Sequence, residues 1–218
     1  MQKVFSPDSK FMRAMSRLGD LMLLNVFFLL CCIPVITIGA ANTALYTVCF
    51  RFGTDREGGT VRSFFRAFRD NFRQSTALWL VTLLCGGTAG LNTYVFYLMP
   101  GSIRYGFILF ALLFVLVLLI FGYTFPLLSQ FDNSVFSTLK NALVLALGYL
   151  PRSVLMAVLN MLPWALLLAN ILLFFQAGLI WVMVYFASAA YANTFILRKV
   201  FAPYLPDDDS HDEQEGSP

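Results

Sequence analysis

The chain alternates between long uncharged, apolar stretches and short segments that carry most of its charges. The uncharged stretches are residues 21–50, 75–101, 105–131 and 153–197. An α-helix rises about 1.5 Å per residue, so about 20 apolar residues cross the ~30 Å hydrocarbon core of a bilayer. We therefore expect an all-α fold, a polytopic membrane helical bundle with six transmembrane helices. The expected spans are residues 19–34, 36–52, 76–98, 105–128, 153–173 and 179–197.

The second expected span is the shortest of the six. Pro34 and Gly39 interrupt the first apolar stretch near its middle, so this stretch forms either one bent span with a leftover piece or a tight hairpin of two short spans. As a helix, residues 36–50 extend only about 22 Å, so this span depends on local thinning of the bilayer. A re-entrant hairpin, and hence five spans, is the alternative.

Two connectors between expected spans, residues 61–75 and 134–149, have the pattern of amphipathic helices. In the first, phenylalanines recur at helical spacing beside a row of arginines. These residues are Phe64, Phe65, Phe68 and Phe72 together with Arg62, Arg66, Arg69 and Arg73. Such a helix is typical of the membrane interface, where rings meet acyl chains and guanidiniums meet phosphates. The alternative is that the arginine row docks on an acidic surface of a partner protein. Nucleic acid is not expected, because the rings would be buried and unable to stack on bases.

The basic residues favour one orientation of these spans. With six spans, 14 of the 15 lysines and arginines fall on the side that holds both termini, and only Arg104 lies opposite. Basic residues accumulate on the cytoplasmic side of inner-membrane proteins. We therefore expect both termini in the cytoplasm.

The composition excludes an ordinary soluble domain. Hydrophobic residues make up 59% of the chain and charged residues 12%, against about 45–50% and 25% in soluble domains. Residues 1–201 are expected to form one membrane domain. Six of the 12 acidic residues lie between Asp207 and Glu215, so residues 202–218 are expected to form an acidic, disordered cytoplasmic tail.

No pattern of catalytic or metal-binding residues stands out. The four cysteines lie in apolar stretches without a Cys-x-x-Cys pair, and the single histidine, His211, lies in the acidic tail. Phosphate-binding Gly-x-x-x-x-Gly-Lys, zinc-binding His-Glu-x-x-His and nucleophilic Gly-x-Ser-x-Gly motifs are absent from the sequence. We expect a protein that is not an enzyme and has no cofactor or metal.

Polar residues within the expected spans are the default candidates for function. Asp20 and Asn25 lie near the start of the first span, and single asparagines recur in later ones: Asn42, Asn92, Asn160, Asn170 and Asn193. They either form hydrogen bonds between helices or converge on a polar cavity, and the sequence leaves both readings open. Gly86 and Gly90 form a Gly-x-x-x-Gly motif, which predicts close packing of another helix, from this chain or from a partner.

Three segments together resemble the YesL-like family of small bacterial membrane proteins. They are Val-Phe-Ser-Pro-Asp-Ser-Lys-Phe-Met-Arg (residues 4–13), Leu-Leu-Cys-Cys-Ile-Pro-Val-Ile-Thr-Ile-Gly-Ala (29–40) and Ser-Phe-Phe-Arg-Ala-Phe-Arg-Asp-Asn-Phe-Arg-Gln-Ser (63–75). The family is uncharacterised and is typically encoded near genes for carbohydrate uptake. The resemblance implies a location in the bacterial inner membrane and a role alongside sugar import.

The leading expectation for function is therefore a non-enzymatic accessory or scaffold subunit associated with an ABC-type carbohydrate transporter. Its contact surfaces would be the Arg/Phe connector, the Gly86–Gly90 face and the charged N-terminal arm. The alternative is a self-sufficient transporter or channel for a small solute, which would use Asp20 and the asparagines of the spans.

Overall fold

The computed structural model describes residues 10–52 and 59–204, and this part of the chain is helical without a β-strand. The α-helices are Lys10–Cys32 (α1), Ile38–Arg51 (α2), Thr60–Leu98 (α3), Gly106–Gln130 (α4), Val135–Gly148 (α5), Leu150–Ala169 (α6), Ile171–Gln176 (α7), Gly178–Ile180 (α8) and Phe186–Phe201 (α9). Short 3-10 helices cover Val35–Thr37 (η1), Ser102–Tyr105 (η2) and Ala202–Tyr204 (η4), and a π-helix covers Trp181–Tyr185 (η3). The expected all-α class is confirmed.

Five helical segments of the described chain are long and apolar enough to cross a bilayer. They are Met15–Cys32, Thr60–Leu98, Ser102–Gln130, Leu150–Ala169 and Gly178–Tyr204. The chain is therefore a multi-pass membrane protein. The expected acidic tail lies outside the described residues from 205 onward, as do residues 1–9 of the N-terminal arm.

The expected second span forms α2, which is not among these five segments. Its 14 residues extend only about 21 Å. Most of its side chains are buried by other helices, from Gly39 through Phe50 with Asn42 as the exception. α2 is therefore the central helix of the protein rather than a lipid-facing one, which explains why its short length is tolerated.

The first connector, residues 61–75, does not form the separate interfacial helix that we expected. It is continuous with the following span in α3, a single helix of 39 residues. Residues 71–79 (Asn-Phe-Arg-Gln-Ser-Thr-Ala-Leu-Trp) contain neither proline nor glycine, so no residue there favours a break. α3 is consequently about 58 Å long, close to twice the hydrocarbon thickness. The second connector, residues 134–149, forms α5 at nearly the expected bounds.

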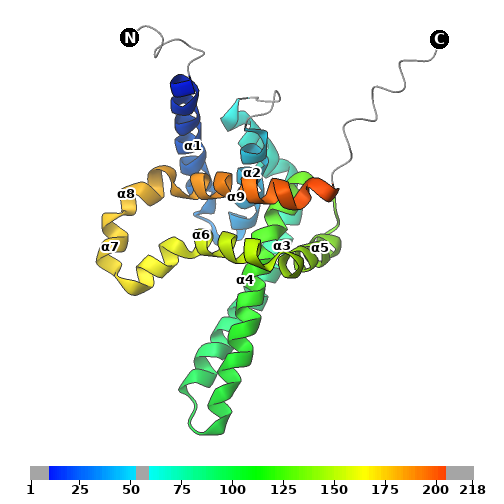
Figure 1. Ribbon diagram of the computed structural model, residues 1–218, viewed down its shortest axis with the longest axis vertical. Coiled ribbons are helices and arrows are strands. Elements are labelled where there is room, and N and C mark those ends of the chain that lie inside the picture. The colour runs from blue at the N-terminus through cyan, green and yellow to red at the C-terminus, as the bar shows by residue number, and fades with distance from the viewer. Residues whose placement is uncertain (1–9, 53–58, 205–218) are drawn as a thin grey trace, which may run out of the picture.

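The two halves of α3 have different neighbours. In the first half, Thr60 donates a hydrogen bond to Asp20 of α1 (2.9 Å), and the Phe65 ring lies 5.3 Å from that of Phe27. In the second half, Phe96 packs on Phe110 of α4 at 5.1 Å between ring centroids. Figure 1 shows the result: the α3–α4 hairpin extends from one end of the molecule, and α1 and α2 lie toward the other.

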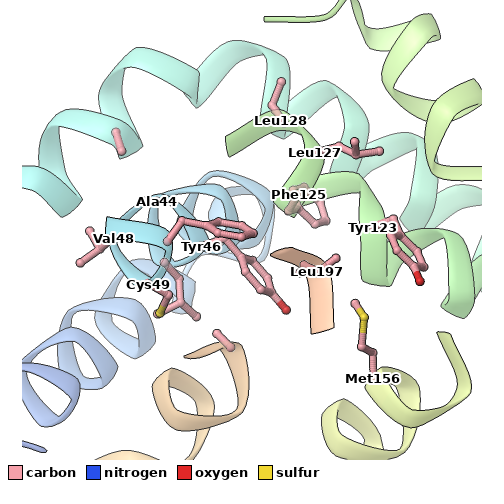
Figure 2. Packing of buried hydrophobic residues seen from close by; sticks show 14 of the residues in the cluster. Ala44, Tyr46, Val48, Cys49, Tyr123, Phe125, Leu127, Leu128, Met156 and Leu197 are labelled. Atoms are coloured by element: carbon pink, nitrogen blue, oxygen red, sulfur yellow. The ribbon is translucent and has the colours of Figure 1, made fainter. Parts of the chain in front are cut away.

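The helices of the C-terminal half run across this axis. Figure 1 shows α6 and α9 crossing the direction of α3 and α4 near the middle of the molecule. Their side chains complete the core around α2, where Tyr46, Phe125, Met156 and Leu197 from four helices are buried together (Figure 2). The hydrophobic core therefore lies where the two helix directions meet.

Gly39 sets the closest approach of α2 to α3. A β-carbon at this position would lie 2.4 Å from the Ser75 carbonyl oxygen and 2.6 Å from the Trp79 β-carbon. Beside it, the hydroxyls of Thr43 and Ser75 are hydrogen-bonded at 2.8 Å. Small residues permit this kind of helix contact in membranes, so the first turn of α2 requires glycine.

We predict that Gly39→Ala separates α2 from α3 and destabilises the protein by roughly 1–3 kcal/mol, the usual cost of overpacking. Thermal unfolding of the detergent-solubilised protein measures this as a lower melting temperature. Gly87→Ala in α3 is the matched control, because a β-carbon there has no neighbour within 4 Å. Equal melting temperatures for the two variants would show that the contact at Gly39 is not tight.

Candidate solute-binding cavity

A cavity of about 380 Å³ lies at the junction of α1, α2, α4, α6, η3 and α9. Most of its wall is apolar, and none of its 17 lining side chains is charged. Its polar side chains are Cys32 of α1, Asn42 and Tyr46 of α2, Asn160 and Trp164 of α6, and Tyr185 of η3. Small-molecule sites are commonly cavities of this kind, largely apolar with a few polar groups that fix orientation.

A fully buried asparagine, Asn193 of α9, supports one wall of the cavity. Its Nδ2 donates to Asn160 Oδ1 at 3.0 Å and to the Tyr46 hydroxyl at 3.2 Å. Its own Oδ1 is buried without a hydrogen-bond partner. Three side chains from α2, α6 and α9 thus form one hydrogen-bonded cluster, which we call the amide cluster (Tyr46, Asn160 and Asn193).

The π-helix η3 brings Tyr185 to the cavity, and Asn25 of α1 stabilises this π-helix. A π-helix interrupts the i to i−4 hydrogen bonds of the helix that contains it. Asn25 Nδ2 donates to the carbonyls of Trp181 (2.9 Å) and Val182 (2.7 Å), and its Oδ1 accepts from the Ala187 N–H (2.8 Å). One buried side chain therefore bonds to three main-chain groups of η3 and α9, which lie 156 to 162 residues later in the sequence.

The structure separates the predicted polar residues into groups with different roles. Asn42 and Asn160 line the cavity, Asn193 lies behind it, and Asn25 holds η3. Three others lie elsewhere: Asp20 accepts from Thr60, Asn92 donates to the Thr88 carbonyl of its own helix, and Asn170 accepts from two N–H groups at the start of α7.

The structure also shows where two of the predicted contact surfaces lie, the Gly86–Gly90 face and the Arg/Phe connector. Gly86 and Gly90 face α4 of the same chain, with Val117 and Phe114 as their neighbours. In the Arg/Phe connector, Phe64 is buried, Phe68 is partly buried, and Phe65 and Phe72 are exposed beside the four exposed arginines. Arg66 forms an exposed ion pair with Asp70 at 3.8 Å.

Sequence reasoning missed the tyrosines and the tryptophan of the cavity, Tyr46, Trp164 and Tyr185, as well as its four phenylalanines. A signal was present for two of them, because Tyr46 follows Asn42 and Trp164 follows Asn160 by four residues. Residues four apart share a helix face. Tyr185 had no such signal, since the π-helix shifts the register of its face.

In the described part of the chain, no group of three or more His, Cys, Asp or Glu residues is arranged to hold a metal ion.

These features define a multi-pass helical membrane protein with an uncharged cavity between its helices. Residues 21–93 match the family described as "Protein of unknown function, DUF624", to which YesL-like proteins belong. The matched segment covers the second half of α1, all of α2 and most of α3, and includes Asn25, Asn42 and Tyr46. No curated protein and no solved structure matches the chain.

We predict that Asn25→Leu destabilises the protein by roughly 1–3 kcal/mol, because it leaves buried main-chain groups of η3 without their partner. The measurement is thermal unfolding in detergent. Asn92→Leu is the control: the same substitution at a spanning-helix asparagine that bonds only to its own helix should change stability by less than about 0.5 kcal/mol. A similar loss in both variants would contradict the assigned role of Asn25.

Proposed function

We propose that this protein binds a small uncharged solute inside the membrane and carries it across. The observation that supports this proposal most strongly is the uncharged cavity in which Asn42, Tyr46 and Asn160 meet. Of the two functions expected from the sequence, this geometry favours the self-sufficient transporter.

The amide cluster is costly for a purely structural element. Polar groups at membrane depth are expensive to bury, and an unpaired buried acceptor such as Asn193 Oδ1 costs roughly 1–3 kcal/mol. The large majority of buried polar side-chain atoms have a hydrogen-bond partner, and Asn193 Oδ1 is an exception. In this protein two helices present amide groups to a space large enough for a solute.

We propose further that the protein lies in the inner membrane and that its solute is a carbohydrate or a related polyol. The distribution of basic residues supports an inner-membrane location with both termini in the cytoplasm. The YesL-like resemblance supports a carbohydrate or a related polyol as the solute, which agrees with a cavity that has hydrogen-bonding groups but no charge.

Solute entry into proteoliposomes tests the proposal. We predict that the purified protein accelerates the entry of at least one of glycerol, erythritol, xylitol and glucose, measured by stopped-flow light scattering. Filling the cavity with Ala189→Leu should return the rate to that of protein-free liposomes. Ala189 lines the cavity, so the larger side chain occupies the space of the solute.

The matched control is Ala192→Leu on the same helix, at a position that does not line the cavity. This variant should keep the wild-type rate. Entry of all four solutes at the protein-free rate, or equal rates for the two variants, would overturn the proposal.

A second candidate function is the accessory subunit of a transporter, supported by the α3–α4 hairpin. The end of this hairpin extends beyond the other helices (Figure 1), and its outer apolar side chains are exposed, with Leu84 67%, Leu91 63% and Leu112 64% accessible. Exposed apolar surface of this kind is covered by lipid or by a membrane partner.

We predict for this second candidate that the protein co-purifies from native membranes, in mild detergent, with subunits of a sugar transporter. Replacing Leu84, Leu91 and Leu112 by alanine should weaken that association while leaving the cavity intact. The same substitutions at Leu155 and Val158 of α6, also exposed, are the control. A protein that purifies alone, and whose loss leaves sugar uptake unchanged, would exclude the accessory role.

A further inference from the structure

The hydrogen bonds around the cavity determine which of its groups remain able to bind a solute. A primary amide has two N–H donors on Nδ2 and acceptor capacity on Oδ1, and a tyrosine hydroxyl has one donor. Because Asn193 donates to Asn160 Oδ1 and to the Tyr46 hydroxyl oxygen, it uses acceptors of both residues. The Asn160 Nδ2 protons and the Tyr46 hydroxyl proton are not used by Asn193. This wall of the cavity therefore offers donors.

The other polar side chains of the cavity add an acceptor at Tyr185 and groups of both kinds. Asn42 Nδ2 donates to the Ile38 carbonyl at 3.1 Å, and the Tyr185 hydroxyl donates to the Leu159 carbonyl. The Tyr185 hydroxyl spends its single proton there and remains only an acceptor, whereas Asn42 keeps its Oδ1 acceptor and one Nδ2 proton. Tyr185 therefore offers an acceptor, Asn42 offers both kinds of group, and the indole N–H of Trp164 adds a donor to the cavity wall.

The uncharged lining of the cavity also constrains the charge of the solute. No lining side chain is charged, and an ion within a largely apolar cavity at membrane depth would lack a counter-charge.

The burial of Asn193 determines how this residue can affect a solute. Its side chain is 0% exposed and it does not line the cavity, so it acts on a solute only through Asn160 and Tyr46.

We propose that the cavity selects uncharged solutes that present an oxygen acceptor, as a ketone or a hydroxyl does, to Asn160 and Tyr46. Asn193 is the positioning residue that sets this selectivity, because its amide orients both donors. The proposal rests on the proposed function and makes it more specific. It also accounts for the unpaired Asn193 Oδ1, because the amide is held in the orientation that turns its donors toward Asn160 and Tyr46.

The test uses Cys32, which lines the cavity, as a reporter in the full-length protein in lipid nanodiscs. In a Cys31→Ser/Cys85→Ser background the remaining cysteine, Cys49, is fully buried. The rate of Cys32 modification by N-ethylmaleimide is measured with increasing cyclohexanone (acceptor only), cyclohexanol (donor and acceptor), methylcyclohexane (neither) and cyclohexylammonium (charged). A molecule in the cavity slows the modification, and the concentration for half protection gives its affinity.

For each probe, the half-protection concentration is divided by that of methylcyclohexane in the same protein. For cyclohexanone and cyclohexanol this ratio should be roughly five- to tenfold lower in the wild-type protein than in Asn193→Leu, which corresponds to the loss of one hydrogen bond. Partitioning of each probe into lipid is the same for both proteins and cancels in the comparison. Asn193→Leu should still be protected by methylcyclohexane, a result that a general loss of structure would not give. If Asn193→Leu does not fold, Asn160→Leu removes the donor directly and should give the same selective loss.

The possible outcomes separate the two proposals. If no probe protects Cys32, the cavity is not a binding site and the proposed function fails. If methylcyclohexane protects as well as cyclohexanone in the wild-type protein, or if Asn193→Leu keeps the preference, the inference about acceptors and Asn193 is wrong while solute binding stands. Protection by cyclohexylammonium as strong as that by cyclohexanol would overturn the requirement for an uncharged solute.

Discussion

A polar group buried in the hydrocarbon core must find its partner inside the protein, because no water is present to replace it. The arrangement of the C-terminal helices depends on this constraint. Asn25 of α1 satisfies three main-chain groups around η3, and this fixes α1 against η3 and the start of α9. Once η3 is held there, Tyr185 reaches the cavity from one side. Asn193, eight residues further along, reaches the amide cluster.

The cavity results from a second constraint, the close contact of α2 with α3 at Gly39. This contact places the short helix α2 at the centre of the protein, and its Asn42 and Tyr46 line the cavity together with residues of α4, α6 and α9. α6 and α9 cross the direction of α4 (Figure 1), and the cavity lies where side chains of these helices meet those of α2. Packing and hydrogen bonding thus combine to leave a lined space at the junction.

Local patterns predicted much of the fold, and contacts between distant residues account for what they missed. The apolar stretches predicted the all-α membrane fold, and the pattern of residues 134–149 predicted the helix observed as α5. Both predictions depend only on residues that are close together in the sequence. The continuity of α3 was missed because amphipathicity changes near residue 75 without a helix-breaking residue. The asparagines were identified as candidates, but Asn42, Asn160 and Asn193 come from three separate helices, and no spacing in the sequence reveals that they meet. For the same reason the sequence could not show that α4 of this chain is the partner of Gly86 and Gly90.

The length of α3 has a consequence for the surrounding membrane. The apolar part of α1 lies beside the first half of α3, and α4 lies beside the second half. The apolar surfaces of α1 and α4 are therefore displaced from one another along the axis of α3. If α3, about 58 Å long, stood perpendicular to the membrane, a flat bilayer about 30 Å thick could not cover both apolar surfaces at once. Hydrophobic mismatch of this size is relieved by tilting the protein or by deforming the lipid. The inclination of the whole molecule, and with it the depth of the cavity, is therefore coupled to membrane thickness.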